Sequence, residues 1–378
     1  MGREKNGKWR ADTTKMKGRK RRIAIIMILL LLCACGKSKE PVELFPAQDG
    51  GGISASGSRT GQEDNGPAPT DASAQKQPIE PKNKLYWAPE ELETIPRSYF
   101  EPAEEQGKLV PFIYNTYEAF TYDQRSVMLE KRAFVYLPYD YDENKKYDIM
   151  YFMHGGGGTE AWLLGNRTQV QGFKNVIDHA IQDKRVKPLI IVCPTYRNAG
   201  YGEVYVERQD MAMKLCAIYY KELMNDLVPS VERHYSTYAE GKTDPESLKA
   251  SRDHRCFGGF SNGSVACWYV FAHGTDYFRW FMPMSCGATL PDVELNVIAA
   301  GLQPDSFFIY LMTGTKDFAL ACDSAKAQLM RNSPYYLEYS SPSDIGNFVY
   351  RTGKGYVHGD IAAREYIYNG IQFFFGYG

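Results

Sequence analysis

One serine lies in a pattern that is typical of a covalent nucleophile. The segment Gly259-Phe260-Ser261-Asn262-Gly263 is the only Gly-x-Ser-x-Gly sequence among the 378 residues. It follows an apolar run and precedes a helical pattern, which is the context of a nucleophile elbow. Glycines flank such a serine because larger side chains would collide in the tight turn. The pattern predicts Ser261 as a nucleophile, against the plainer interpretation of a glycine-rich turn with an incidental serine.

A serine hydroxyl needs a base before it can attack a carbonyl carbon. Two histidines follow Ser261 in the chain, His273 and His358. His273 falls on the predicted helix that begins at the elbow, pointing away from the strand ends. His358 falls in a loop between the last predicted strand and the last predicted helix. In the chain order serine, acid, histidine, His358 is therefore the predicted general base.

The acid of such a triad is expected between these two residues, in a loop after a strand. The apolar run Phe307–Met312 leads directly into Thr313-Gly314-Thr315-Lys316-Asp317. Asp317 is predicted to hold the imidazole in one tautomer and to stabilise its charged form. The competing acids are Asp292, Asp305, Asp323 and Asp344. Of these, Asp305 precedes the strand, and Asp323 is interpreted as the N-cap of a helix.

The oxyanion that forms during attack on an ester needs two backbone N–H donors. The residue after the nucleophile, Asn262, is expected to supply one. The run His154-Gly155-Gly156-Gly157-Gly158 follows an early predicted strand and is expected to supply the other, from Gly156. A phosphate-binding loop is the alternative for this run, but no Gly-Lys-Ser/Thr or Gly-x-Gly-x-x-Gly pattern accompanies it. His154 is interpreted as a structural residue of the loop.

Short apolar runs alternate with longer helical patterns around these residues. Strands are predicted at Ala133–Leu137, Ile149–Met153, Leu189–Cys193, Cys256–Phe260, Trp280–Met284, Phe307–Met312 and Asn347–Arg351. Helices are predicted at Phe173–Gln182, Asp210–Glu232, Asn262–Ala272, Ser324–Arg331 and Ile361–Phe375. Near-continuous apolar strands that alternate with helices predict an α/β fold, a doubly wound and mostly parallel sheet with helices on both faces. The candidate residues follow strands, where reactive groups of such sheets gather.

These motifs together resemble the α/β-hydrolase esterases of carbohydrate esterase family 1, which include feruloyl and acetylxylan esterases and esterase D relatives. The resemblance extends from Arg132 to the C-terminus. It implies the α/β-hydrolase fold and a serine esterase that works through an acyl-enzyme without metal or cofactor. The chain departs from many relatives at Asn262, where they carry methionine. Since the oxyanion donor is a backbone N–H, this change bears on substrate fit more than on mechanism.

The expected substrates are feruloyl or acetyl esters on plant cell-wall polysaccharide such as xylan. Aromatic walls suit a feruloyl ring or the face of a sugar. Trp162 and Arg197 are the predicted substrate contacts, and Tyr196, Tyr201 and Tyr205 lie near them in the sequence. A secreted acyltransferase or a siderophore-ester hydrolase with the same triad remains the alternative. A serine peptidase is disfavoured because no lid or propeller segment is evident.

The N-terminal segment is interpreted as a targeting segment. A basic block precedes the apolar run 23–32, and ten helical residues are too short to span a hydrocarbon core of about 30 Å. Leu32-Cys33-Ala34-Cys35-Gly36 resembles a bacterial lipobox, with Cys35 as the lipidated residue. We expect a lipoprotein signal peptide over 1–35, a flexible low-complexity linker over 36–81 and the esterase domain over 82–378. A plain signal peptide or an uncleaved anchor is the alternative, and Met16 is a possible start.

The protein is expected at the outer face of a bacterial cell membrane, attached through its N-terminal lipid alone, or secreted into the medium. The formal net charge is −1, from 44 basic and 45 acidic residues. Residues 1–22 hold ten of the basic and two of the acidic residues, so the remainder has 34 basic and 43 acidic residues and a net charge of −9. This acidic body argues against a nucleic-acid partner. The cysteines after the leader show no metal-binding spacing, and no disulfide is predicted.

Overall fold

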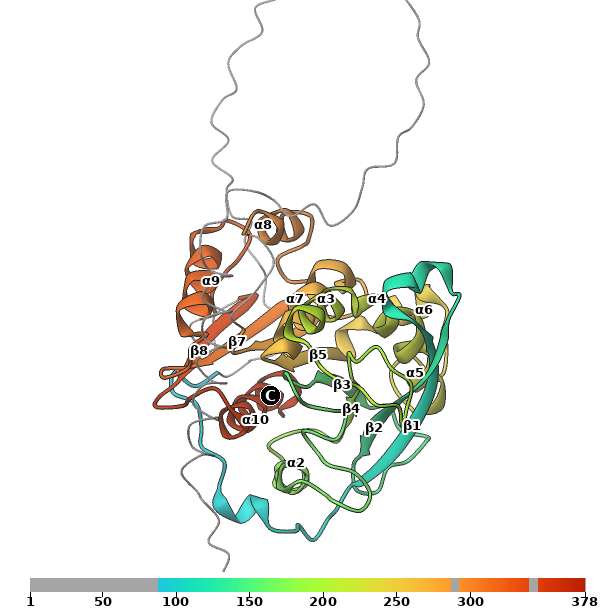
Figure 1. Cartoon of the computed structure of the whole chain (residues 1–378). Coiled ribbons are helices and arrows are strands. Elements are labelled where there is room, and N and C mark those ends of the chain that lie inside the picture. Colours follow the sequence, from blue (N-terminus) through green and yellow to red (C-terminus); the bar gives the residue numbers. More distant parts are fainter. Residues whose placement is uncertain (1–87, 287–291, 340–345, 378) are drawn as a thin grey trace, which may run out of the picture.

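An eight-stranded sheet forms the centre of the computed structural model, which describes residues 88–286, 292–339 and 346–377 (Figure 1). The strands are β1 (Lys108–Tyr117), β2 (Met128–Leu137), β3 (Asp148–Met153), β4 (Leu189–Cys193), β5 (Arg255–Phe260), β6 (Trp280–Met284), β7 (Phe308–Gly314) and β8 (Phe348–Gly353). Their order is β1-β2-β4-β3-β5-β6-β7-β8. The pairs β1–β2 and β2–β4 are antiparallel, and the rest of the sheet is parallel.

Helices cover both faces of this sheet. They are α2 (Gly172–Gln182), α3 (Gln209–Ile218), α4 (Tyr220–Glu222), α5 (Val228–His234), α6 (Pro245–Ala250), α7 (Asn262–Gly274), α8 (Asp292–Ala300), α9 (Leu320–Asn332) and α10 (Asp360–Phe375). Short helical turns occur at η1 (Arg97–Phe100), η2 (Ala119–Gln124), η3 (Leu223–Leu227) and η4 (Arg252–His254). Helices α2 and α10 pack on one face, whereas α3, α5 and α7 pack on the other. The predicted α/β architecture is confirmed.

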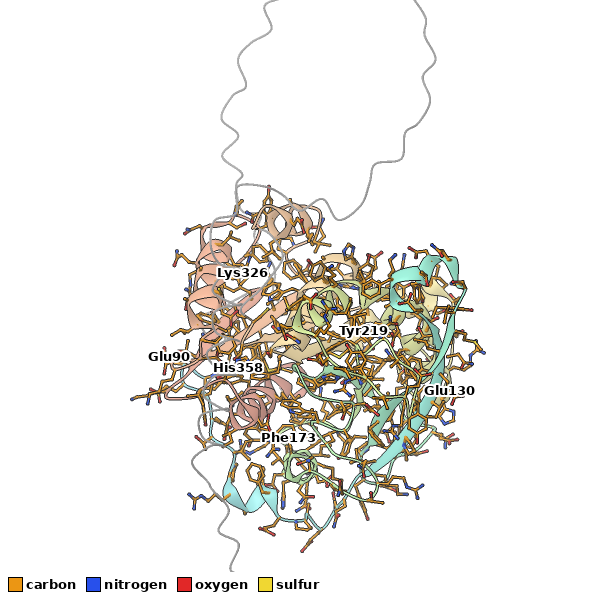
Figure 2. The ribbon with its side chains drawn as sticks, viewed as in Figure 1. Glu90, Glu130, Phe173, Tyr219, Lys326 and His358 are labelled. Carbon is orange, nitrogen blue, oxygen red and sulfur yellow. The ribbon has the colours of Figure 1, made fainter. Side chains whose placement is uncertain are left out.

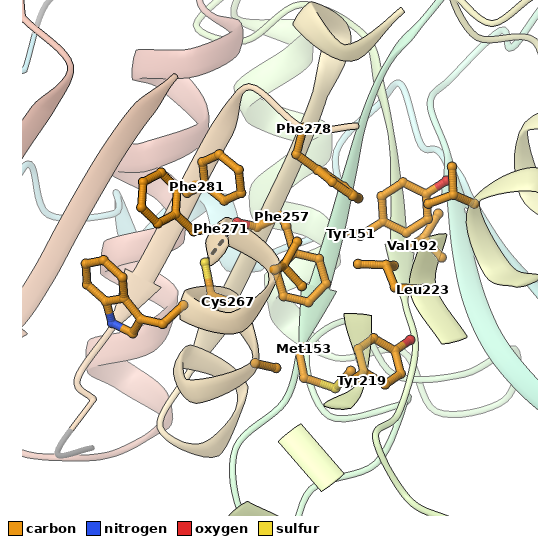
Figure 3. Packing of buried hydrophobic residues seen from close by; sticks show 14 of the residues in the cluster. Tyr151, Met153, Val192, Tyr219, Leu223, Phe257, Cys267, Phe271, Phe278 and Phe281 are labelled. Carbon is orange, nitrogen blue, oxygen red and sulfur yellow. Dashed lines mark hydrogen bonds between the residues drawn. The ribbon is translucent and has the colours of Figure 1, made fainter. Parts of the chain in front are cut away.

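The two faces of the sheet form two separate apolar layers. In β3, Tyr151 and Met153 belong to the layer under α7, while Met150 and Phe152 belong to the layer under α2 and α10. This split follows from the period of two in a strand, which sends successive side chains to opposite faces. Figure 3 shows the first layer, where Phe257 of β5 packs beside α7 and its carbonyl accepts a 3.3 Å hydrogen bond from the Cys267 thiol.

All seven predicted strands are present, and the eighth strand, β1, was missed. Its burial alternates and it carries Pro111, so it lacks the continuous apolar run of the buried strands. It lies at the edge of the sheet, where such a sequence is tolerated.

The helix predicted over Asp210–Glu232 is in fact divided into α3, α4 and α5, with the π-turn η3 between the last two. Helices α6 and α8 were also not predicted. Over the described ranges, no helix combines the length and apolar character that a membrane crossing needs. The predicted signal peptide with Cys35, the predicted linker and residues 82–87 of the expected domain lie outside the described residues.

Candidate active site

Ser261 lies at the turn between β5 and α7 with a strained backbone. Its φ is 58° and its ψ is −117°, a region that non-glycine residues rarely adopt. A Cβ at Gly259 would lie 2.1 Å from the Gly263 carbonyl oxygen, and one at Gly263 would lie 2.2 Å from the Met153 carbonyl oxygen. Both flanking glycines are therefore required by backbone contact, as the sequence pattern predicted, and the turn has the geometry of a nucleophile elbow.

His358 and Asp317 are brought together from two loops that lie at the same end of the sheet. The Lys316 N–H donates to the Tyr356 carbonyl at 3.0 Å, and the Gly355 N–H donates to Thr315 Oγ1 at 2.8 Å. Between the side chains, His358 Nδ1 lies 3.0 Å from both carboxylate oxygens of Asp317. Figure 2 shows His358 close to α10. The arrangement suits an imidazole that is held by a carboxylate and presents its other nitrogen to a reactant.

The environment of Asp317 keeps its carboxylate ionised. Burial by itself raises the pKa of this group, but the hydrogen bond from His358 and the 2.8 Å bond from the Ala319 N–H outweigh it. The pKa of Asp317 is therefore below its usual range. Two aromatic rings flank the imidazole, Phe260 at 4.6 Å and Phe318 at 4.3 Å between ring centroids. These rings limit the orientations that His358 can take.

One pocket unites the predicted nucleophile and base. Ser261, His358, Gly156 and Asn262 all line it. No hydrogen bond joins the Ser261 hydroxyl to His358 in the described part of the chain. Such bonds are often long in unliganded sites and shorten when substrate is present.

The two predicted oxyanion donors, Gly156 and Asn262, lie next to Ser261 in the pocket. Asn262 is the first residue of α7, so its N–H has no partner inside the helix. Among the described residues, neither the Asn262 N–H nor the Gly156 N–H is bonded to a protein acceptor. A Cβ at Gly156 would lie 3.1 Å from Asn262 Nδ2, so the glycine loop and the elbow are in close contact. Two free amides next to a nucleophile can stabilise a developing oxyanion.

A hydrogen-bond network that the sequence did not reveal supports these donors. Glu207 Oε1 accepts from the Gly157 N–H at 2.9 Å, and its Oε2 accepts from the Tyr196 hydroxyl at 3.0 Å. The Asn262 amide contacts the Tyr196 hydroxyl at 3.3 Å and accepts from Gln209 Nε2 at 2.9 Å. Glu207 and Gln209 lie far from both motifs in the chain and share no spacing with them, so only the fold reveals their role.

His154 belongs to the scaffold of the glycine loop, as expected. The ring is buried, with Nδ1 2.8 Å from the Gly155 carbonyl oxygen and Nε2 2.8 Å from Thr195 Oγ1. Burial lowers the pKa of His154 to about 3, so the imidazole is neutral at physiological pH. It connects the end of β3 to the segment after β4.

The predicted substrate contacts divide between two places. Trp162 lines the pocket of Ser261 and is stacked nearly parallel on Phe260, with 6.0 Å between the centroids. Arg197 does not line this pocket. It lines a neighbouring hollow, with its guanidinium 5.1 Å from the Tyr205 ring. Tyr196 is buried in the network described above.

The interpretation of Asp323 as a helix N-cap is wrong. Helix α9 begins at Leu320 with Ala319 as N-cap, and Asp323 is buried inside its first turn. The Asp323 carboxyl accepts hydrogen bonds from the Thr313 hydroxyl and the Cys286 N–H. Burial raises the pKa of Asp323 well above its usual range. Tertiary contacts, which a local sequence pattern does not contain, decide this position.

The described cysteines and acidic residues show no metal chemistry. Cys193, Cys216, Cys256, Cys267 and Cys286 are buried free thiols. Within the described ranges, no group of three or more histidine, cysteine or acidic side chains could hold a metal ion.

Known proteins share both the fold and much of the sequence. The Esterase family model matches residues 127–286. Endo-1,4-beta-xylanase Y of Acetivibrio thermocellus is 35% identical over 288 residues, which are 74% of this chain and 24% of that protein. The chain thus spans about a quarter of the length of that relative.

Two solved structures extend the comparison. A serine-to-alanine variant of the feruloyl esterase module from Clostridium thermocellum, in complex with sinapinate, is 32% identical with a TM-score of 0.64. The match covers 76% of this chain and 95% of the module. A CE1 ferulic acid esterase from the anaerobic fungus Anaeromyces mucronatus is 20% identical and shares the fold, with a TM-score of 0.56 over 75% of this chain and 97% of that one. The chain therefore belongs to the same esterase family as the feruloyl esterase module from Clostridium thermocellum and is a carboxylic ester hydrolase.

Proposed function

We propose that the protein removes feruloyl groups from a plant cell-wall glycan such as xylan, with Ser261 as nucleophile, His358 as base and Asp317 as the orienting acid. The observation that carries this proposal is the single pocket in which the strained elbow serine meets a histidine bound to a buried carboxylate. The names of the relatives, a xylanase and a feruloyl esterase module, support the substrate class.

The reaction proceeds in two steps. Ser261 Oγ attacks the ester carbonyl carbon while His358 Nε2 takes its proton, and the Gly156 and Asn262 amides hold the oxyanion. The intermediate collapses as His358 returns the proton to the sugar oxygen, which leaves as an alcohol. Water then attacks the acyl-enzyme while His358 takes its proton, and His358 returns that proton to Ser261 Oγ as the acyl–Oγ bond breaks and the free acid leaves.

The walls of the pocket favour an aromatic acyl group over acetyl. Trp162, Phe260 and Phe318 surround Ser261, with Met213 and Val265 adding apolar surface. A planar aromatic acid can stack on such rings, whereas an acetyl group would leave much of this surface in water.

The test is hydrolysis of methyl ferulate and of acetylated xylan by wild type and by Ser261→Ala. We expect ferulate release that drops by several orders of magnitude in the folded variant. Release of acetate alone would overturn the feruloyl preference and keep the serine mechanism. An unchanged rate in Ser261→Ala would overturn the assignment of the nucleophile.

We also propose that the enzyme is exported and held at the membrane by a lipid on Cys35. The support is the basic block, the short apolar run and the lipobox-like sequence. Radiolabelled palmitate should be incorporated into wild type expressed in a bacterial host and not into Cys35→Ser. Equal labelling of Cys35→Ser and wild type would overturn the assignment.

A further inference from the structure

A second hollow lies beside the pocket of Ser261. Four residues with polar or aromatic side chains define this side hollow: Arg197, Tyr201, Glu203 and Tyr205. Thr159 and Glu160, which follow the glycine loop, form its border. The main pocket and the side hollow therefore share one loop. Thr159 is three positions after Gly156 in the chain, a span of at most about 11 Å.

Arg197 lines the side hollow with a guanidinium group that has few described partners. Over the described ranges it forms no ion pair, and its one described side-chain hydrogen bond is a 3.5 Å contact to the Gly157 carbonyl. Its neighbours differ, because Lys131 pairs with Glu222 at 2.8 Å and Arg132 pairs with Glu160 at 2.6 Å. A guanidinium has five N–H donors, so Arg197 keeps donors that a ligand could use.

The loop after β4 presents aromatic rings to this hollow. Exposure alternates along residues 204–207: Val204 and Val206 are 94% and 80% exposed, whereas Tyr205 and Glu207 are half-buried. This alternation turns Tyr205 toward the hollow and Glu207 toward the Gly157 N–H. Tyr201 adds a second ring, 51% exposed and stacked on the Arg132 guanidinium at 4.3 Å.

Rings, a free guanidinium and carboxylates in one hollow match a neutral sugar. The apolar face of a sugar stacks on tyrosine, and its hydroxyls both donate to carboxylates and accept from arginine. Lys131 and Arg132 also line the hollow, but each is already paired with a glutamate. The groups left for a ligand are the Arg197 guanidinium and the Glu203 carboxylate, which together carry no net charge and suit a neutral polar ligand better than an anion or a purely apolar one.

We propose that the side hollow binds a neutral sugar residue of the glycan that carries the ester. This inference rests on the proposed function, since the acyl group occupies the main pocket and the sugar continues into the side hollow. The side hollow then sets the preference of the enzyme for an oligosaccharide ester over a simple methyl ester.

The test compares kcat/KM for a feruloylated arabinoxylan oligosaccharide and for methyl ferulate. Tyr205→Ala and Tyr201→Ala should each lower the ratio of oligosaccharide to methyl ester about tenfold, which corresponds to about 1.4 kcal/mol. Tyr139→Ala is the matched control, because Tyr139 is 52% exposed and lies outside both hollows. It should leave the ratio unchanged.

Binding provides a readout that does not depend on hydrolysis. Calorimetry with the unesterified arabinoxylan oligosaccharide should show weaker binding to Tyr205→Ala than to wild type. Proportionate losses on both esters together with equal oligosaccharide binding would overturn the side hollow as a sugar site. Failure of wild type to release ferulate, with oligosaccharide binding that still depends on Tyr205, would overturn the proposed acyl group and keep the sugar site.

Discussion

The two ends of β5 differ in how their polar groups are used. At its start, Arg255 is buried and all five guanidinium N–H groups are bonded. The acceptors are both carboxylate oxygens of Glu232, the carbonyls of Leu248 and Tyr277, and Ser251 Oγ. At its end, the Ser261 hydroxyl and the Asn262 N–H have no partner among the described residues.

This difference indicates that the start of β5 serves the stability of the fold, whereas its end serves the reaction. Buried polar groups are nearly always hydrogen-bonded, since an unpaired one costs free energy. The start of β5 follows that rule, as the ion pair of Arg255 and Glu232 shows with Nε and Oε1 2.6 Å apart. At the carboxyl end of β5, the Ser261 hydroxyl and the Asn262 N–H are exceptions to this rule, and a substrate can supply their missing partners. Mutations at the first end should lower stability, and those at the second should lower the rate.

The largest effect is expected from Asp317→Asn. The variant keeps the size of the side chain but loses the charge that stabilises an imidazolium, so kcat should fall by about four orders of magnitude. The measurement is methyl ferulate hydrolysis alongside a thermal melt. Asp244→Asn, at the cap of α6, is the control and should retain full activity, since asparagine also caps helices. A loss below tenfold would exclude Asp317 as the triad acid.

At the other end, Glu232→Gln should lower the free energy of unfolding by about 3–5 kcal/mol, because it leaves the Arg255 charge buried without its partner. The rate per folded molecule should stay close to that of wild type. Glu338→Gln removes the partner of Arg331 in a similar pair that is more exposed, and should cost at most about 1 kcal/mol. Urea titrations measure both, and equal destabilisation by the two substitutions would contradict the comparison.

An effect of intermediate size is expected on the pH dependence of stability, through His154. The folded protein holds His154 neutral with a pKa of about 3, whereas the unfolded chain takes up a proton near pH 6.5. The contribution that neutral His154 makes to the free energy of unfolding is fully present above pH 6.5. It falls as the pH drops toward 3, by up to about 1.4 kcal/mol per pH unit from this residue. His154→Gln should flatten the slope of unfolding free energy between pH 6.5 and 5, and identical slopes would contradict the assignment.

The smallest effect is expected from Glu207→Gln. A glutamine has a single side-chain oxygen, so it cannot accept from both the Gly157 N–H and the Tyr196 hydroxyl. The glycine loop should be held less firmly, and kcat on methyl ferulate should fall about tenfold with KM little changed. Exposed Glu240→Gln serves as the control. A rise in KM with an unchanged kcat would instead assign Glu207 to substrate binding.

The buried strands and the candidate triad could be predicted from local patterns. A continuous apolar run specifies a strand that is buried on both faces, and Gly259 and Gly263 specify a turn that only glycine fits. The chain order of Ser261, Asp317 and His358 completes the set. Edge strand β1 was not predicted, because its side chains alternate between core and solvent and Pro111 interrupts the pattern.

Tertiary structure decided the features that depend on residues far apart in the chain. Glu207 supports the glycine loop across 50 positions, and Asp323 is buried because β7 and the end of β6 surround it. Arg197 was predicted to contact substrate, but its position in a separate hollow follows from how the loop after β4 folds back. Sequence by itself determined which residues are the candidates for nucleophile, base and acid, since the patterns that point to them are short motifs. Only the fold decided their partners and surroundings, because hydrogen bonds and cavities depend on distances between segments that no local pattern specifies.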